Sequence, residues 1–394
     1  MRYDLGMVTT HVSPARGFGG VAVSAARLAA AWAEVSSRYV GLCSSNASEN
    51  GSISAEDVRL GVNVTVRLYD TYWFRRWGFG LGAIPLLISL CRRSQVVYIN
   101  GIATWPTTLG AIICCFYKRP FIVALRGGLM PEHVQHIRRR KPWKWLFYKL
   151  LTFPYLRQAK TIHCTGKLEA DGAKALLEEK LPVVIVPNGI ALPPLPSTAP
   201  PLIEEQLVLT YIGRISHEKG INALLKAWMK ARRPVDKFLV AGSGTGSAVD
   251  PYFEEFQEIA SRSGKAVEYH GYLNSSEVNK LIEAAHFLVL PSGLDGDVRE
   301  NFGNAAAEAL ALGRPVIVCK GLEWDDIEAS GAGLVFDRHP EAAVEVIHRA
   351  GATKKESWVH MAEKARMYAE QRLDIRVTAE QIWDTAKKFM EYPG

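Results

Sequence analysis

Short apolar runs alternate with helical stretches along almost the whole chain, and this alternation limits the possible folds more than any other feature. Runs such as YDLGMVTT, VVYINGI, FIVAL, LVLTYIG and FLVLPS are typical of buried strands. The stretch at 21–35 repeats apolar residues every three or four positions, which predicts a helix with one apolar face. Strands separated by such helices predict parallel sheets with helices on both faces, an α/β fold.

A proline-rich segment divides the alternation into two halves. Residues 187–202, PNGIALPPLPSTAPPL, contain six prolines, a composition that continues neither a helix nor a central strand. The 394 residues are enough for two domains of ordinary size. We therefore predict two Rossmann-like, doubly wound domains at 1–190 and 206–372, joined by a linker at 191–205. A helical segment at 373–394 is expected to pack back toward the N-terminal domain.

Charge is distributed unevenly between the two halves. Residues 1–200 contain 24 Lys and Arg against 11 Asp and Glu, whereas residues 201–394 contain 23 against 29. The first half is therefore expected to meet an anionic partner. No segment resembles a signal peptide or a membrane span, and the six cysteines form no C-x-x-C pair. These features favour a cytoplasmic protein with reduced thiols.

A glycine-rich turn follows the first predicted strand. In HVSPARGFGG, Gly19 and Gly20 directly precede the predicted helix at 21–35. Glycines at such a turn let the backbone approach a ligand closely, and the N–H groups at a helix N-terminus favour an anion such as phosphate. An ordinary glycine-rich connector would have the same composition.

Two cations lie in the first strand-to-helix loop of the second domain. In YIGRISHEKG, Arg214 follows a strand and Lys219 precedes a helix. A guanidinium that binds in a fork and an ammonium that acts as a point charge suit a diphosphate. The alternative is that both are solvated loop charges.

Two acids, Glu300 and Glu308, lie eight positions apart in RENFGNAAAEALALGRPVIV. A helix is expected to begin near 301–304, between them. Carboxylates accept hydrogen bonds from hydroxyls and repel phosphate, whereas the helix N-terminus attracts phosphate. A ligand with hydroxyls at both ends and a diphosphate in the middle is a nucleotide sugar. The alternative interpretation is that Glu300 interacts favourably with the helix dipole and that Glu308 lies on a solvent-exposed face of the helix.

These motifs together resemble those of the family 4 glycosyltransferases, retaining enzymes of the GT-B fold. The segments GRISHEKG, VAGSG, YHGYL, LPS and ENFGNAAAEALALGRPVIV carry the resemblance in the second half, and GFGG, RGGLMPEH and PNGI agree in the first. The E-x7-E motif falls on Glu300 and Glu308. The resemblance implies two domains that face each other across a cleft, the first on the acceptor side and the second binding the nucleotide sugar.

The resemblance also implies roles for individual residues. Arg214 and Lys219 would bind the diphosphate, Glu300 the hydroxyls of the donor sugar and Glu308 those of the ribose. Arg214, Lys219 and Glu300 would form the catalytic set. The sugar and β-phosphate would also meet the backbone of Phe302, Gly303 and Asn304, and Gly19 and Gly20 would face the phosphates from the opposite domain.

The implied function is transfer of a sugar, of the hexosyl class, from a nucleotide sugar to a glycan or lipid-linked glycan. Bacterial exopolysaccharide and lipopolysaccharide enzymes are the nearest in character, which suggests polysaccharide or cell-surface glycan biosynthesis. The resemblance implies no cofactor and no essential metal. No motif supports a nucleic-acid partner.

The sequence departs from the family pattern at two places. Arg126, in IVALRGG, stands where many relatives have a histidine that contacts the donor sugar, so it is assigned to donor, phosphate or acceptor. The loop GLDGDVREN is longer and more acidic than usual. Its Asp295 and Asp297 match the Asp-x-Asp metal site of unrelated transferases, an interpretation that the two-domain pattern disfavours.

Residues 138–160, RRRKPWKWLFYKLLTFPYLRQAK, interleave basic residues with aromatic ones. This pattern is typical of a helix that lies on an anionic membrane surface. It predicts peripheral attachment to the inner face of the cell membrane. A core helix with a solvated basic end is the rival interpretation.

Three other functions compete with sugar transfer. A nucleotide-sugar epimerase of the same fold would need an acid and a base at the sugar, and the first domain shows no convincing pair. A dinucleotide-dependent oxidoreductase is suggested by AGSGTG at 241–246, which resembles a dinucleotide-binding fingerprint. The segment follows the second strand of its domain, however, and not the first. A catalytically inert glycan- or lipid-binding relative would have lost a motif residue, and all four motif residues are present.

Overall fold

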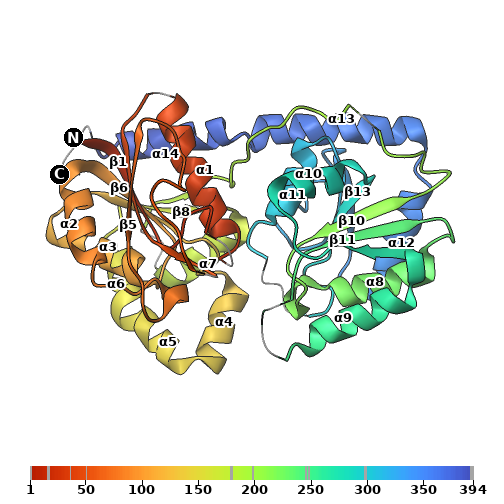
Figure 1. The fold of residues 1–394 in the computed structure, drawn as a ribbon, viewed down its shortest axis with the longest axis horizontal. Coiled ribbons are helices and arrows are strands. Elements are labelled where there is room, and N and C mark those ends of the chain that lie inside the picture. Colours follow the sequence, from red (N-terminus) through yellow and green to blue (C-terminus); the bar gives the residue numbers. More distant parts are fainter. Residues whose placement is uncertain are drawn as a thin grey trace. The chain divides into compact units, whose positions relative to one another are not determined.

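The computed structural model describes residues 2–15, 18–35, 37–49, 51–177, 181–197, 199–244, 246, 249–296 and 300–390. The chain folds into two compact units. Unit 1 comprises Met1–Ile190 and Asp374–Gly394, and unit 2 comprises Ala191–Leu373. Each unit is built on its own parallel sheet (Figure 1), which confirms the predicted α/β class.

Unit 1 contains a 7-stranded sheet with the order β5-β2-β1-β6-β7-β8-β9. Its strands are β1 (Tyr3–Thr9), β2 (Val40–Ser45), β5 (Val64–Tyr69), β6 (Ser94–Asn100), β7 (Phe121–Ala124), β8 (Thr161–Cys164) and β9 (Val183–Ile185). A short antiparallel pair, β3 (Ala47–Ser48) and β4 (Gly51–Ser52), lies outside this sheet. After β1, the chain adds β2 and β5 on one side of that strand. It then crosses to the other side of β1, where β6 to β9 follow in order. The topological switch point therefore lies between β1 and β6.

Helices cover both faces of the unit 1 sheet. They are α1 (Gly20–Val35), α2 (Ala83–Arg93), α3 (Trp105–Phe116), α4 (Pro131–Arg140), α5 (Pro142–Phe147), α6 (Phe153–Leu156), α7 (Lys167–Leu177) and α14 (Ile375–Lys387), with shorter helical turns η1 (Arg75–Trp77) and η2 (Tyr148–Thr152). The cores on the two faces are separate. One core takes its helical residues from α1 and α14, and the other from α2 to α7 and η2.

The last helix of the chain, α14, packs against α1 in unit 1. The indole Nε1 of Trp32 donates a hydrogen bond to the carbonyl of Ala379, at 3.0 Å. The guanidinium of Arg38 lies over the Trp383 ring, 3.9 Å from its centroid, and pairs with Glu380 at 3.3 Å. Residues from the end of the described chain therefore complete a core that begins with α1.

Unit 2 contains a 6-stranded sheet with the order β12-β11-β10-β13-β14-β15. Its strands are β10 (Val208–Ile212), β11 (Lys237–Ala241), β12 (Val267–Tyr269), β13 (Phe287–Leu290), β14 (Val316–Cys319) and β15 (Gly333–Phe336). Its helices are α8 (Ile221–Ala231), α9 (Pro251–Arg262), α10 (Ser275–Glu283), α11 (Asn304–Ala311), α12 (Pro340–Gly351) and α13 (Lys355–Arg372), with turns η3 (His217–Lys219) and η4 (Gly264–Ala266). Figure 1 shows α8, α9 and α12 on one face and α10, α11 and α13 on the other.

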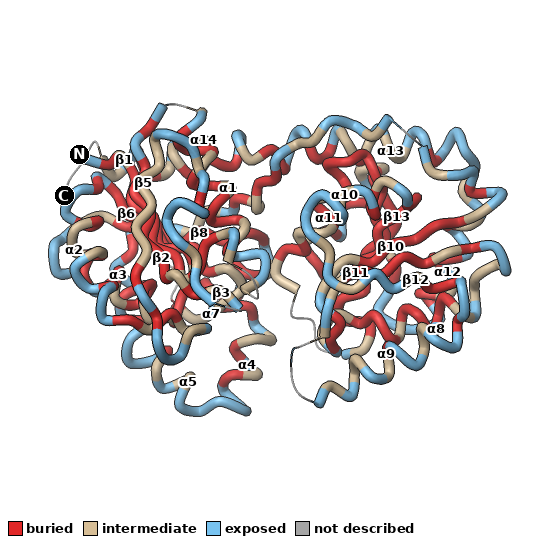
Figure 2. Tube along the Cα trace, in the orientation of Figure 1, coloured by how far each residue is buried: buried red, intermediate tan, exposed pale blue. Residues whose placement is uncertain are grey.

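The central strands of both sheets are among the most deeply buried parts of their units (Figure 2). All described residues of β2, β7, β8, β13 and β14 are buried. Because both faces of a parallel sheet are covered, its strands read as continuous apolar runs rather than as an alternating pattern.

None of the helices in the described part of the chain combines the length and apolar character that a membrane span needs.

Candidate functional site

The switch point of the unit 2 sheet lies between β10 and β13. These strands are hydrogen-bonded neighbours, yet β11 and β12 separate them in the sequence. In open α/β sheets, ligands bind beyond the carboxyl ends of the strands at such a point. Lys219 comes from the loop after β10, and Glu300 from the loop after β13.

Lys219 and Glu300 form an ion pair between these two loops. The ammonium of Lys219 contacts the Glu300 carboxylate, and the two side chains are only 21% and 11% exposed. The hydroxyl of Ser292 donates to the same carboxylate at 3.1 Å. Gly220 follows Lys219 with a φ of 69°, and a Cβ there would lie 2.4 Å from the carbonyl oxygen of Pro291. The glycine therefore allows the close loop approach that brings the pair together.

The helix α11 begins beside this pair without a capping side chain. Gly303 occupies the N-cap position in the left-handed conformation, with φ 77° and ψ 64°. The first turn carries no acidic residue. The preceding carbonyl, of Phe302, accepts a hydrogen bond from the Trp324 indole at 2.5 Å. The first N–H groups of a helix have no partner within it, so this N-terminus suits an anionic ligand.

Glu308 lies one turn along α11, on the same face as Asn304 because the two are four residues apart. Both are half-buried. The opposite face of the helix is buried through Ala306, Ala307 and Leu310. The small side chains let α11 pack closely, and the two polar residues remain on its accessible side.

Arg214 is placed differently from Lys219. Its side chain is 58% exposed and pairs with Glu218, four residues further along the chain, at 3.8 Å. Its carbonyl accepts a hydrogen bond from the buried Tyr211 hydroxyl at 2.7 Å. Burial raises the pKa of Tyr211 well above its usual value, and the nearby Glu300 carboxylate raises it further. The structure therefore fixes the Arg214 backbone near Glu300 and leaves its guanidinium accessible.

In unit 1, Gly19 and Gly20 lie at the start of α1, as the sequence indicates. Gly19 has a φ of 70°, and a Cβ at this position would meet no atom within 4 Å. A glycine is therefore favoured at position 19 because of its backbone conformation, and not because a larger side chain would clash. The first turn of α1 carries no acidic residue.

Arg126 is held by three acceptors of unit 1. Its Nε donates to Asn100 at 2.6 Å, one terminal nitrogen donates to Asn188, and the other donates to the Tyr98 hydroxyl at 3.1 Å. Arg126 itself has a φ of 52°, which is uncommon for a residue other than glycine. The guanidinium is therefore fixed in place by its neighbours.

A buried carboxylate that the sequence analysis missed supports the Arg126 turn. Glu169 in α7 is fully buried and accepts hydrogen bonds from the backbone N–H groups of Gly127 and Thr165, the second at 2.8 Å. Burial raises its pKa, although these hydrogen bonds and Arg126 oppose the rise. The only sequence signal for this role was an acid among the small and apolar residues of KLEADGAKALL.

His163 gives unit 1 a sensitivity to acid. It is buried, with one ring nitrogen 2.6 Å from the Tyr98 hydroxyl and the other 2.8 Å from the carbonyl of Val186. Burial lowers its pKa from 6.5 to about 3, and Arg126 adds to this effect. The unfolded chain then binds more protons than the folded one between these values, so stability falls as the pH drops below about 6.5.

We expect the free energy of unfolding to fall by roughly 3 kcal/mol from this residue between pH 7 and pH 4. Thermal unfolding of the wild type and of His163→Gln across this range measures the effect. The variant is expected to be less stable at neutral pH but to lose less stability on acidification. Parallel pH profiles for the two proteins would contradict the assignment to His163.

The glycine-rich segment at 241–246 has a structural explanation. Gly242 has a φ of 146°, and a Cβ there would lie 1.8 Å from the carbonyl oxygen of Gly213. The segment therefore lets the loops after β10 and β11 touch through their backbones. Thr245, in the same segment, lies outside the described residues.

The Asp-x-Asp interpretation concerns the loop after β13. Asp295 accepts a hydrogen bond from the Tyr252 hydroxyl at 2.5 Å and lies 3.4 Å from the backbone nitrogen of Ala223. Asp297 lies outside the described residues. Among the residues that the structure describes, no three His, Cys, Asp or Glu side chains are grouped to hold a metal ion.

Comparison with known proteins finds a match to a family model within unit 2. Residues 198–370 match the family model for the glycosyl transferases group 1. The lipopolysaccharide 1,2-N-acetylglucosaminetransferase of Salmonella typhimurium is 30% identical over 225 residues, 49% of this chain and 54% of that protein. An uncharacterized glycosyltransferase of Methanocaldococcus jannaschii is 33% identical over 116 residues, 29% of this chain and 27% of that protein. The matches thus span between about a quarter and about half of these relatives.

Similarity to solved structures extends over nearly the whole chain. HepE of Anabaena in complex with UDP and glucose aligns with a TM-score of 0.73 and 18% identity, covering 98% of this chain and 100% of that one. Sucrose-phosphate synthase from Thermosynechococcus elongatus aligns with a TM-score of 0.75 and 16% identity, covering 99% and 100%. The chain therefore has the predicted GT-B fold, and its residues 198–370 are similar to the group 1 glycosyl transferases.

Proposed function

We propose that the protein is a retaining glycosyltransferase that takes its sugar from a nucleotide-sugar donor and needs no metal ion. The observation that carries the proposal is the Lys219–Glu300 pair, which lies at the switch point of the unit 2 sheet beside the uncapped N-terminus of α11. The match of residues 198–370 to the group 1 family supports the same assignment. So do the solved complexes of HepE with UDP and UDP-glucose.

In this proposal the donor spans the site from Glu308 to Glu300. Glu308 accepts hydrogen bonds from the ribose hydroxyls, and Glu300 accepts them from the donor sugar. Lys219 and Arg214 bind the diphosphate. Since a phosphate repels carboxylates and attracts cations, Lys219 would be shared between Glu300 and the diphosphate when the donor binds.

The α11 N-terminus supplies the remaining diphosphate contacts. The backbone at Phe302, Gly303 and Asn304 would bind the β-phosphate and the sugar. Preorganised cations and N–H groups then stabilise the charge that grows on the leaving nucleoside diphosphate. For unit 1, the roles of Gly19, Gly20 and Arg126 toward donor or acceptor remain predictions from the sequence.

We further propose that the transferred sugar is a hexose and that the acceptor is a glycan or lipid-linked glycan, with the reaction in the cytoplasm. The lipopolysaccharide N-acetylglucosaminetransferase among the relatives favours a role in cell-surface polysaccharide synthesis. Incubation with a panel of UDP-, GDP- and ADP-sugars, with release of free nucleoside diphosphate as readout, tests the proposal. Turnover of none of these donors would contradict it, and conversion of a donor to its epimer would replace it.

Glu308→Gln is expected to weaken binding of the donor nucleotide by about tenfold or more. The substitution removes the charge from a hydrogen bond to ribose, and such bonds contribute roughly 1.5–3 kcal/mol. Calorimetric titration with the nucleoside diphosphate of the donor measures the change. Glu345→Gln, at a residue of α12 in the same unit, is a matched control. Equal affinities for the wild type and Glu308→Gln would remove the ribose role.

A further inference from the structure

Unit 1 exposes three consecutive aromatic side chains in the loop after β5. Tyr72, Trp73 and Phe74 are 78%, 72% and 75% exposed. Leu81, a few residues on, is 67% exposed and, with Trp73, borders a hollow of about 460 Å³. Single exposed apolar residues are normal in a folded protein, but a cluster of this size marks an interaction surface.

The base of this loop is firmly attached to the unit 1 core. The Trp77 indole donates to the carbonyl of Ala103 at 2.9 Å, and the Tyr69 hydroxyl donates to the carbonyl of Gly78 at 2.9 Å. Phe74 adopts the left-handed conformation, with a φ of 48°, which is rare for a bulky residue. The aromatic tip is therefore projected by a well-anchored turn.

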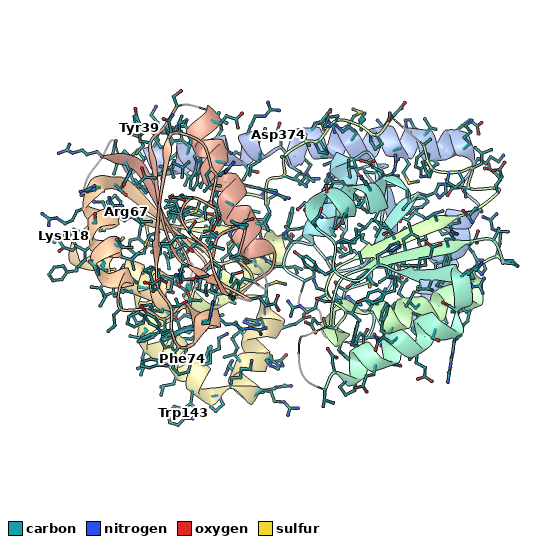
Figure 3. All side chains as sticks on the ribbon, viewed as in Figure 1. Tyr39, Arg67, Phe74, Lys118, Trp143 and Asp374 are labelled. Atoms are coloured by element: carbon teal, nitrogen blue, oxygen red, sulfur yellow. The ribbon has the colours of Figure 1, made fainter. Side chains whose placement is uncertain are left out.

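A second exposed apolar element lies next to the loop. Trp143 in α5 is 82% exposed, and Leu150 in η2 is 65% exposed. The rings of Trp77 and Phe147 contact each other edge to face, 5.9 Å between centroids, and so join the loop to α5. Figure 3 shows Phe74 and Trp143 at the same edge of unit 1. We call residues 72–77 and 138–151 together the aromatic-basic surface.

The aromatic-basic surface itself contains basic but no acidic residues, and Asp70 lies at the edge of the neighbouring hollow. Glu132 is the only acidic residue between positions 71 and 168, a stretch with 16 Lys and Arg residues. The four consecutive residues 138–141 are basic and exposed. Arg138 and Lys149 lie over the Trp145 ring, at 5.3 and 5.7 Å from its centroid. Cations held against aromatic rings beside exposed apolar side chains are complementary to anionic headgroups above an acyl layer.

We propose that the aromatic-basic surface docks unit 1 on an anionic lipid bilayer, with the tip at Tyr72, Trp73 and Phe74 inserted at the interface. The sequence pattern at 138–160 predicts the basic half of this surface. The aromatic tip, which comes from 60 and more positions earlier in the chain, is added by the fold. The docking does not depend on the sugar-transfer reaction, so its test needs no donor.

The test is flotation of the full chain with vesicles of phosphatidylcholine, with and without phosphatidylglycerol. The wild type is expected to bind only the anionic vesicles, and less at high salt. Trp73→Ser/Phe74→Ser is expected to lower the affinity about tenfold or more, because two interfacial side chains are lost. Arg139→Gln/Arg140→Gln/Lys141→Gln is expected to lower it by about fivefold per charge.

Phe116→Ser is the matched control. Phe116 is 80% exposed in the same unit, and it lies two residues before Lys118, which Figure 3 shows at a different edge from Phe74 and Trp143. This variant is expected to bind vesicles like the wild type. A circular dichroism spectrum and melting curve of each variant establish that it is folded.

Three outcomes would overturn the proposal. The wild type could fail to bind anionic vesicles, or Trp73→Ser/Phe74→Ser could bind as well as Phe116→Ser. Alternatively, sedimentation could show a dimer that Trp73→Ser/Phe74→Ser dissociates, in which case a second copy of the chain covers the surface. A blue shift of tryptophan emission on vesicle addition, absent from the Trp73→Ser/Phe74→Ser variant, would support insertion of the tip.

Discussion

Lys219→Ala is expected to lower the rate of sugar transfer about a hundredfold or more while the protein still folds. The ammonium is the most enclosed cation of the proposed diphosphate site, since its side chain is only 21% exposed. Loss of one preorganised charge-stabilising donor costs on the order of 3 kcal/mol in the barrier. Steady-state turnover with the preferred donor and acceptor measures the loss.

The change also leaves the Glu300 carboxylate with only Ser292 as a described hydrogen-bond donor. Lys219→Ala/Glu300→Gln removes that unpaired charge, so it is expected to recover stability without recovering turnover. Lys226→Ala is the matched control, because Lys226 lies on α8 in the same unit and pairs with Glu255 at 2.6 Å on the surface. Near-normal turnover of Lys219→Ala would refute the central role given to this residue.

Gly242→Ala is expected to destabilise unit 2 by roughly 3–5 kcal/mol. Its φ of 146° is a conformation that L side chains rarely adopt, and the new methyl would lie 1.8 Å from the Gly213 carbonyl oxygen. Neither atom is at the end of a flexible side chain, so the strand ends themselves must move. Chemical denaturation followed by circular dichroism measures the change in unfolding free energy.

Gly271→Ala serves as the control for backbone strain alone. Gly271 has a φ of 66°, and a Cβ there would meet nothing within 4 Å. Gly271→Ala is expected to lower the free energy of unfolding by only about 1–2 kcal/mol. If both variants unfolded at the same denaturant concentration, close backbone contact would not be the reason for glycine at position 242.

The sequence predicted the fold class because its signals are local. Each central strand of a parallel sheet is buried on both faces, so it appears as a short apolar run whatever its neighbours are. The strand order then follows from regular crossovers, and it places the loops after β10 and β13 side by side. The E-x7-E motif and the basic loop therefore indicated one site before any distance was known.

The contacts within the site were less predictable because they join distant segments. Nothing in the sequence pairs Lys219 with Glu300 rather than with Glu218, and Ser292 appeared only as the end of a strand motif. The support of Arg126 by Asn100 and Asn188 joins residues at or beyond the ends of three different strands, β7, β6 and β9. The sequence shows Asn100 at the end of a predicted strand and Asn188 in PNGI, but it does not show which side chain they contact. That contact depends on the fold.

The exposed aromatic tip was missed for a related reason. Tyr72, Trp73 and Phe74 look in sequence like core residues, because aromatic side chains are usually buried. Only their exposed fractions separate them from Tyr69, three positions earlier, which is 4% exposed. Apolar character predicts burial, and exceptions to that rule are found from the structure.

The helix α14 has a consequence for the order in which the protein matures during synthesis. Residues 374–390 belong to unit 1, yet they are translated after the whole of unit 2. Until they emerge, Trp32 on α1 lacks the carbonyl of Ala379, and the apolar surface beneath Ile382 and Ala386 is open to water. Unit 1, whose synthesis begins first, can therefore be completed only after all of unit 2 has been translated.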